Sequence, residues 1–239
     1  MAMKRSEVNR VIREMEEVIR ANGFHLPPFA SWTPEEWKTK GHECDEIRDN
    51  MLGWDITDFG RGDFEKCGLG LITIRNGNLK MHDKYKKPYA EKLLLAKEGQ
   101  ITPFHFHWHK MEDLINRGGG VLEVTLYSKD KTDPKEGIDY KADVVVYCDG
   151  VRKTFPAGYV LELKPGQSVT MTQGMYHQLC AKPGTGSVLI GEVSQTNDDN
   201  TDNKFAVQVG RFPKIMEDEP PYRLLCNEYP AAAADASKL

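Results

Sequence analysis

Apolar residues recur at helical spacing near the N-terminus of the chain. Between residues 4 and 22 the apolar positions are Val8, Val11, Ile12, Met15, Val18 and Ile19. This i, i+3, i+4 pattern is typical of an amphipathic helix. Ser6 is a candidate cap at the start, and Gly23 is placed to end the helix. We therefore expect a helix over residues 4–22.

A second helix start follows at residues 33–36, Thr-Pro-Glu-Glu. Thr33 offers an N-cap oxygen, Pro suits the first turn, and Glu36 stands in the capping-box position. The preceding Leu-Pro-Pro-Phe of residues 26–29 cannot continue a helix. We expect this second helix to run toward Asn50, with an irregularity near Gly41.

After Gly53 the hydrophobic period changes from 3.6 to 2, which indicates half-buried strands. The predicted strands cover residues 69–75, 91–97, 121–127, 144–147, 159–163, 168–172 and 187–193. Asn76-Gly77 predicts a tight hairpin turn. Residues 129–141 are polar and turn-rich and predict an exposed loop, and residues 197–203 predict an acidic, Asn-rich loop that could act as a lid or a wall.

Helices are thus expected only in the first fifty residues, and short strands follow. This order favours an α+β, mainly β fold, an antiparallel barrel or jelly roll with an N-terminal helical extension. No internal repeat or Gly/Ser-rich linker divides the 239 residues, so we expect one domain. Its expected parts are the helical extension, residues 1–52, the barrel core, residues 53–212, and a tail, residues 213–239.

Composition excludes several classes of function. The net charge of −4 gives no reason to expect nucleic acid as a partner. No apolar run approaches the ~20 residues that span a bilayer, and the N-terminus lacks the apolar core of a secretory signal. The five cysteines are odd in number and contain no CxxC pair, which fits a reducing compartment. We expect a cytoplasmic protein, and we interpret the C-terminal Ser-Lys-Leu of residues 237–239, a peroxisomal address, as a chance match.

Three histidines and one glutamate form a candidate metal site. His105 and His107 are two residues apart, so on a strand they point to the same face. Glu112 follows on the next segment, and His177 lies far along the chain after Gly174. Three imidazoles and one carboxylate suit a divalent transition metal that keeps positions open for substrate.

The remaining histidines have no expected role as ligands. His109 is too far along an extended strand to share one ion with His105 and His107, so we expect it behind the site or exposed. His25 and His42 lie in the helical region and His82 in a loop.

The spacing around the candidate ligands resembles the two cupin motifs. Residues 99–119 match the first motif, with its Gly, two His, Glu and Gly at the usual intervals. Residues 166–177 match the second motif around its His. The sequence departs from this motif at Thr172 and at Ala181, four residues after His177, where cupins usually have Pro and Asn.

Most of the chain further resembles the bacterial D-lyxose isomerases of the cupin superfamily. The stretches that carry the likeness are residues 26–31, 52–55, 89–92, 105–108, 116–120, 191–194 and 225–229. The resemblance implies a cupin-type barrel and a Mn²⁺-dependent ketol-isomerase that interconverts D-lyxose and D-xylulose, with D-mannose and D-fructose as slower substrates. Co²⁺ and Fe²⁺ also tolerate this ligand set. We expect a homodimer.

Such an isomerisation needs groups besides a metal. A carboxylate must move a proton between carbons 1 and 2 through an enediol, and a cation near the developing oxyanion lowers the barrier. A hydride shift is the alternative and needs no such base. Glu192, on an apolar strand where a carboxylate without a role is costly, is the leading base. Glu112 is a candidate for both ligand and base.

Four residues are candidates for substrate contact. Lys110 could reach the sugar oxygens, in catalysis as well as binding, or be a solvated turn residue. An inward Lys92 among leucines is unusual unless it has a role. Asp202 and Arg211 flank the loop of residues 197–203, and they could contact substrate hydroxyls or pair with each other.

Other motifs have simpler interpretations, and two alternative functions stay open. Trp54 and Trp108 are expected to pack in the core. The glycines of residues 116–120 are expected to form a sharp barrel turn. An Fe²⁺-dependent cupin dioxygenase would use the same four ligands, and a non-catalytic sugar-binding cupin would use the same pocket. The polar residues expected around the ligands favour a polyhydroxylated substrate over an apolar one.

Overall fold

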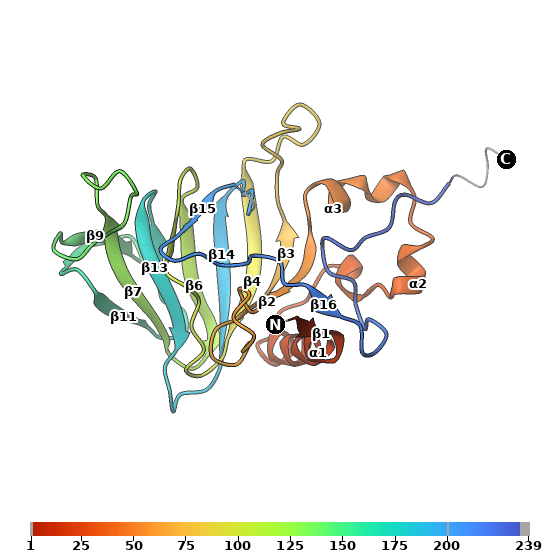
Figure 1. Cartoon of the computed structure of the whole chain (residues 1–239), viewed down its shortest axis with the longest axis horizontal. Coiled ribbons are helices and arrows are strands. Elements are labelled where there is room, and N and C mark those ends of the chain that lie inside the picture. Colours follow the sequence, from red (N-terminus) through yellow and green to blue (C-terminus); the bar gives the residue numbers. More distant parts are fainter. Residues whose placement is uncertain (1, 200, 235–239) are drawn as a thin grey trace.

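The computed structural model describes residues 2–199 and 201–234, so the C-terminal Ser-Lys-Leu lies outside the described residues. Within these ranges, two antiparallel sheets pack face to face and the helices gather at one end (Figure 1). The mainly β, cupin-like fold with an N-terminal helix is confirmed. Among the described residues, no helix has the length and hydrophobicity to cross a membrane.

The helices occupy the first fifty residues, as expected. They are α1 (Arg5–Ala21), η1 (Pro28–Ser31), α2 (Pro34–Trp37), η2 (His42–Cys44) and α3 (Asp45–Asp49). In the larger sheet the strands follow the order β10 (Val151–Phe155), β9 (Val144–Cys148), β12 (Ser168–Met171), β6 (Glu112–Gly119), β14 (Val188–Gln195), β4 (Tyr89–Ala96), β3 (Leu69–Arg75) and β2 (Gly53–Thr57).

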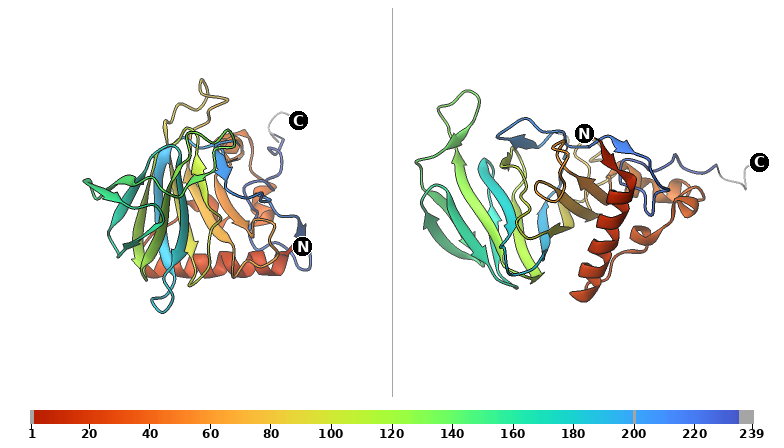
Figure 2. Two further views of the ribbon diagram at one scale, coloured as in Figure 1. Left: turned by 60° about the vertical axis from the view of Figure 1, so that its left-hand side comes forward. Right: turned by 60° about the horizontal axis from the view of Figure 1, so that its bottom comes forward.

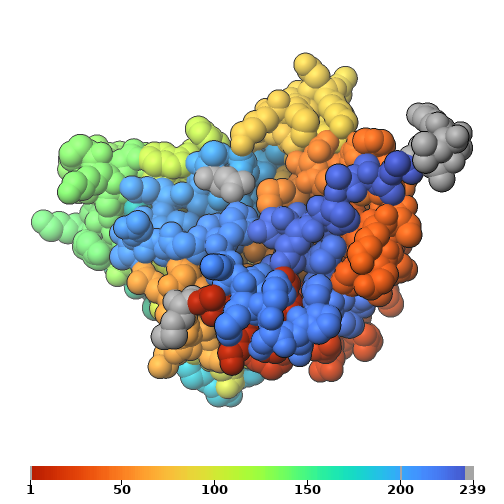
Figure 3. Space-filling model, turned by 45° about the vertical axis from the view of Figure 1, so that its right-hand side comes forward, coloured from red at the N-terminus to blue at the C-terminus, as the bar shows by residue number. Residues whose placement is uncertain are grey.

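The smaller sheet contains the strands that carry the histidines. Its order is β11 (Tyr159–Leu163), β7 (Leu122–Lys129), β13 (Met175–Ala181), β5 (His105–His107) and β15 (Asn203–Phe205), with β8 (Ile138–Asp139) paired to β7. A parallel pair joins β1 (Met3–Lys4) to β16 (Ile215–Met216). The C-terminal segment thereby runs back across the molecule to the helical end (Figures 1 and 3).

Two apolar clusters hold these layers together. One lies between the sheets and includes Leu94 and Ile190. The other lies between α1 and the larger sheet, where Leu93 and Leu189 pack with the apolar face of the helix, at the position seen in Figure 2. Adjacent residues on β4 and on β14 therefore pack in different clusters. Each fully buried aliphatic side chain stabilises the fold by about 1.5–3 kcal/mol.

The first helix is confirmed, but its expected cap is wrong. Lys4 is the N-cap residue and makes no side-chain cap bond. Ser6 instead bonds through its N–H and hydroxyl to the carboxylate of Asp218. Gly23 follows the helix with a φ of +71°, the left-handed conformation that favours glycine.

The second helix begins as predicted and ends earlier. Thr33 and Glu36 form the reciprocal capping box at the start of α2. The helix nevertheless stops at Trp37, and Gly41 is extended, with φ −84° and ψ −157°. The remaining path toward Asn50 is divided between η2 and α3.

The predicted tight hairpin at Asn76-Gly77 is wrong. Residues 76–88 form a long loop before β4, although β3 and β4 do pair antiparallel. A two-residue type I′ turn requires positive φ at both positions, and neither Asn76 nor Gly77 has it. The Asn76 side chain instead bonds the backbone of Asn197.

The glycines of residues 116–120 form the predicted sharp turn, and a bulge precedes it. β6 ends at Gly119 and β7 begins at Leu122 in the other sheet, and Gly118 and Gly119 have φ values of +156° and +94°. Across from β6, Leu189 pairs with Gly118 and Ile190 with Asn116, so Arg117 is the extra residue of a β-bulge. Sequence patterning also missed β10 and β13, and it missed the short β8 inside the predicted 129–141 loop.

Candidate active site

Strand geometry brings three histidines together inside the sandwich. His105 and His107 alternate along β5 and share its inner face, and His177 of β13 pairs with His105 across the sheet. One ring nitrogen from each of the three lies within 4.8 Å of the others. His177, although some seventy residues further along the chain, therefore lies close enough to His105 and His107 to bind the same ion.

Glu112 supplies a carboxylate to the same point. It opens β6 in the opposite sheet and is 3% exposed. Its Oε1 lies 3.3 Å from His107 Nε2 and 3.3 Å from His177 Nε2. The four side chains proposed as ligands thus face one another across the space between the sheets.

The hydrogen bonds of the imidazoles fit a metal site. His105 Nδ1 lies 2.9 Å from the Pro103 carbonyl, and His177 Nδ1 lies 3.0 Å from the Met175 carbonyl. A carbonyl there accepts from Nδ1–H and leaves the Nε2 lone pair free to bind a cation. Among the described residues neither ring nitrogen of buried His107 has a well-formed hydrogen bond. The donor set fits a divalent cation without fixing which one.

The ionisation of these groups also suits a cation. Burial, reinforced by neighbouring His177 and His107, lowers the pKa of His105 well below its usual value. Burial and the Lys110 charge lower the pKa of His107 as well. Burial raises the pKa of Glu112, but Lys110 and His107 outweigh it, and the net pKa is well below the usual range. Neutral imidazoles and an ionised carboxylate are the forms that bind metals.

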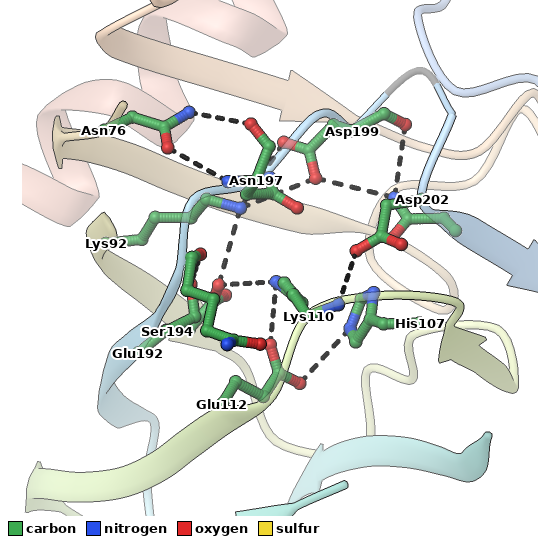
Figure 4. Close-up of polar contacts among 12 residues, drawn as sticks. Asn76, Lys92, His107, Lys110, Glu112, Glu192, Ser194, Asn197, Asp199 and Asp202 are labelled. Atoms are coloured by element: carbon green, nitrogen blue, oxygen red, sulfur yellow. Dashed lines mark hydrogen bonds and ion pairs between the residues drawn. The ribbon is translucent and has the colours of Figure 1, made fainter. Parts of the chain in front are cut away.

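Two lysines and a second carboxylate extend the site (Figure 4). Lys110 Nζ lies 2.7 Å from Glu112 Oε2 and 2.6 Å from Glu192 Oε1. Lys92 pairs with Glu192 in the β4–β14 register, with its Nζ 3.5 Å from Glu192 Oε1. Burial lowers the pKa of Lys110, but the charges of Glu112 and Glu192 outweigh it and raise the net pKa, so Lys110 is a buried cation rather than a solvated turn residue.

Strand alternation explains why these charged residues point inward. Lys92 shares the face of β4 that carries Leu94, and Glu192 shares the face of β14 that carries Ile190. Both faces look into the space between the sheets. The cavity there has a volume of about 50 Å³, and its polar lining includes Lys92, Lys110, Glu112, Glu192, Asp199 and Arg211.

Comparison with known proteins identifies the family. The model of the D-lyxose isomerase family matches residues 3–229. The chain belongs to the D-lyxose isomerase family.

Curated members of the family match nearly the whole chain. The D-lyxose/D-mannose isomerase of Escherichia coli O157:H7 is 44% identical over 228 residues, which cover 95% of this chain and 98% of the relative. That of Serratia proteamaculans is 45% identical with the same coverage. That of Thermosediminibacter oceani is 24% identical and covers 90% of this chain and 99% of the relative.

Solved structures of L-ribose isomerases share the fold. The enzyme of Cellulomonas parahominis matches with a TM-score of 0.59 at 14% identity and covers 90% of this chain and 99% of that chain. The enzyme of Acinetobacter sp. DL28 in complex with L-ribose matches with a TM-score of 0.59 at 13% identity and covers 90% and 98%.

In this member of the family, Asp202 does not pair with Arg211. The Asp202 carboxylate accepts the backbone N–H of His109 at 2.7 Å and that of Lys110 at 3.1 Å. Asp202 therefore positions the turn that carries Lys110, and it does not line the cavity. Arg211 Nη2 lies 2.5 Å from Asp55 Oδ2 and 3.4 Å from Asp199 Oδ2.

Sequence reasoning missed Asp199 and Asp55. Burial raises the pKa of Asp199, but the charges of Lys92, Arg211 and Lys110 outweigh it and lower the net pKa well below the usual range. The one available signal for Asp199 was its place in an acidic loop expected to border the site. Asp55 alternates with apolar residues on β2, a pattern that signals burial but not its arginine partner.

The histidines outside the cluster lie at the surface. His109, His25, His42 and His82 are exposed, as their positions in the sequence suggested. Trp54 is buried and donates its Nε1–H to the Ala30 carbonyl at 2.8 Å, so its expected role in the core is confirmed.

Proposed function

We propose that this protein is a metal-dependent aldose–ketose isomerase that interconverts D-lyxose with D-xylulose and D-mannose with D-fructose. The observation that carries the proposal is one cavity in which the histidine cluster and Glu112 adjoin the buried Lys110–Glu192 ion pair. The names of relatives at 44% and 45% identity supply the sugars.

His105, His107, His177 and Glu112 would hold the cation. Bound there, it would polarise the carbonyl oxygen and a neighbouring hydroxyl oxygen of the sugar as a Lewis acid. We propose Mn²⁺ as the native ion, with Co²⁺ and Fe²⁺ as substitutes, because this mixed nitrogen and oxygen set accepts all three.

Glu192 is the proposed proton carrier. Its carboxylate removes the proton from carbon 2 of the aldose, and the electron pair of that C–H bond forms the double bond of an enediolate. The hydroxyl proton of oxygen 2 passes to oxygen 1, the protonated Glu192 delivers its proton to carbon 1, and the carbonyl re-forms at carbon 2, which gives the ketose and regenerates the carboxylate. Lys110 and Lys92 hold Glu192 in place at 2.6 and 3.5 Å.

Lys110 also stabilises the charge of the intermediate. Its ammonium group is buried between Glu112 and Glu192, beside the point where the enediolate oxygens develop negative charge. A fixed cation in a water-poor cavity lowers the energy of such an anion without reorganising. Lys92, Asp199 and Arg211 line the same cavity and are the proposed partners of the sugar hydroxyls.

The experiment that tests the proposal measures ketose formation in a metal-stripped and reloaded protein. The protein is treated with a chelator, dialysed, supplied with Mn²⁺, Co²⁺ or Fe²⁺, and incubated with D-lyxose or D-mannose. We expect ketose from both sugars only after metal is restored. The absence of ketose with every metal would refute the proposal, and oxygen uptake in its place would point to the dioxygenase.

A second measurement separates the two chemical routes. Reaction in deuterium oxide introduces solvent deuterium at carbon 1 of the ketose if Glu192 exchanges its proton with water during the enediol route. Substrate labelled with deuterium at carbon 2 retains all of its label after a hydride shift. We expect partial loss of the label, because the protonated Glu192 exchanges its proton with water in a fraction of turnovers.

A further inference from the structure

The catalytic cavity is too small for the proposed substrates. Its volume of about 50 Å³ holds one or two water molecules, whereas a cavity of about 150 Å³ accommodates benzene, which is smaller than a pentose. The catalytic groups have almost no contact with solvent, since Lys110 is 3% exposed and Glu192 is 5% exposed. A sugar therefore reaches them only if part of the cavity wall moves.

Arg211 brings a segment from outside the two sheets into the cavity wall. Most of the lining comes from sheet strands, such as Leu94 of β4 and His177 of β13. Arg211 lies instead between β15 and β16, where the chain crosses in front of the sandwich (Figure 1). We call residues 207–213 the strap. Its displacement would open the cavity without breaking a sheet.

The strap is fixed at its two ends and weakly attached between them. At one end β15 pairs with β5, and at the other end β16 pairs with β1. Within the described part of the chain, the backbone of residues 207–213 makes a single hydrogen bond, from the Gly210 N–H to the Phe59 carbonyl at 3.0 Å. Val207 is 51% exposed. Few backbone hydrogen bonds and little burial are typical of segments that open locally.

A buried ion pair holds the middle of the strap against the larger sheet. Arg211 Nη2 lies 2.5 Å from Oδ2 of Asp55, a residue of β2. Asp55 is 4% exposed, and among the described residues Arg211 is its one ion-pair partner. Asp199, the second partner of Arg211 at 3.4 Å, also pairs with Lys92. An open strap leaves the Asp55 carboxylate buried without a cation, so the ion pair favours the closed conformation.

We propose that the strap opens to admit the sugar and closes over it, and that Asp55 holds Arg211 in the closed position. Closure places Arg211 at the cavity, where it is a proposed partner of the sugar hydroxyls, and excludes water from the enediolate. Asp55 is a positioning residue, because it acts on the sugar through Arg211. The inference rests on the proposed isomerase function and adds to it a movement that each turnover requires.

The first test fixes the strap to the loop that follows β2 with a disulfide. A Cβ at Gly60 would lie 3.6 Å from Gly210 Cα, and a Cβ at Gly210 would lie 3.7 Å from Gly60 Cα. These separations suit a disulfide between the two positions. In Mn²⁺-loaded Gly60→Cys/Gly210→Cys, we expect oxidation to lower the turnover of D-lyxose about tenfold or more and a reductant to restore it.

The single variants Gly60→Cys and Gly210→Cys are the matched controls. Each retains the native cysteines and one introduced thiol but cannot form the cross-link, so oxidation should leave its turnover unchanged. Mass spectrometry identifies the cross-linked protein. Cross-linked protein that turns over within about twofold of its reduced form would overturn the inference. The absence of ketose in wild type would instead refute the proposed isomerase function.

Asp55→Asn tests the ion pair and does not depend on the cross-link. The amide keeps the shape of the carboxylate and removes its charge, so the closed strap is less favoured and the apparent affinity for the sugar falls. We expect KM for D-lyxose to rise about tenfold while kcat stays within about threefold of wild type. Asp63→Asn is the control, because Asp63 pairs with Lys66 in the same loop and does not line the cavity, and its KM should match wild type. A lower kcat with an unchanged KM in Asp55→Asn would show that Asp55 only stabilises the fold and would contradict its role in closure.

Discussion

Replacing Lys110 with methionine tests the charge balance on which the proposed chemistry depends. Lys110 Nζ lies between Glu112 and Glu192, and the three side chains are only 2%, 2% and 6% exposed. Methionine keeps most of the side-chain volume and removes the positive charge. Two buried carboxylates are then left without their nearest cation.

The expected loss of stability is large because solvent cannot compensate these charges. Removing one partner of a buried ion pair typically costs about 3–5 kcal/mol. For a domain of this size, that free energy corresponds to a fall in Tm of about 6–20 °C. An exposed pair provides the scale for comparison. Lys38 and Glu35, 4.0 Å apart and 72% and 76% exposed, should contribute less than about 1 kcal/mol.

The assay is thermal unfolding of wild type, Lys110→Met, Lys38→Met and Lys110→Met/Glu192→Gln in the presence of a chelator. The chelator keeps a bound cation from replacing the lost charge. We expect Lys110→Met to unfold well below wild type and Lys38→Met to match it. The double variant should recover part of the loss, because it leaves one buried carboxylate rather than two.

Two results would refute this reasoning. A Tm of Lys110→Met within 2–3 °C of wild type would mean that the pair contributes no more than about 1 kcal/mol, as at an exposed site. A double variant less stable than Lys110→Met would mean that Glu192 is not the group that Lys110 compensates.

Further predictions concern catalysis, metal binding, pH and the backbone. Glu192→Gln should lower kcat by about 10²–10⁴-fold while Mn²⁺ affinity measured by calorimetry stays within a few-fold, and turnover close to wild type would exclude Glu192 as the base. His177→Ala should weaken Mn²⁺ binding at least tenfold by the same measurement, and unchanged affinity would exclude it as a ligand. Asp199→Asn should destabilise the protein above pH 4, and the difference in unfolding free energy from wild type should narrow in acid unfolding curves below pH 4. A carboxyl with a lowered pKa in the folded state contributes stability that disappears as pH falls through that pKa. A difference that stays constant with pH would contradict this prediction. Gly119→Ala should lower the free energy of unfolding in denaturant by about 3 kcal/mol or more, because its φ is +94° and the new Cβ would lie 2.1 Å from the Ser187 carbonyl oxygen. Gly150→Ala, with a φ of +80° and open space around the new Cβ, should lower it by about 1–2 kcal/mol. Equal effects of the two substitutions would show that the contact with the carbonyl is unimportant.

The sequence carried a large part of the fold because local patterns coincide with tertiary burial. The apolar stripe of residues 8–19 faces the core as a helix because no other conformation buries those side chains together. The Asn76-Gly77 hairpin failed for the opposite reason. The amide of Asn76 makes two hydrogen bonds to the backbone of Asn197, 121 residues away, and a local pattern contains no trace of that partner.

By itself the sequence determined which side chains share a face: His105 with His107 on one strand, and Lys92 with Leu94 on another. Strand alternation is a local property, so spacing alone encodes it. Only the tertiary structure decided that Lys110 lies between two carboxylates and that Arg211 pairs with Asp55 rather than Asp202. Those pairings join strands and loops far apart in the chain, and the distance between two charges is set by the packing of whole sheets.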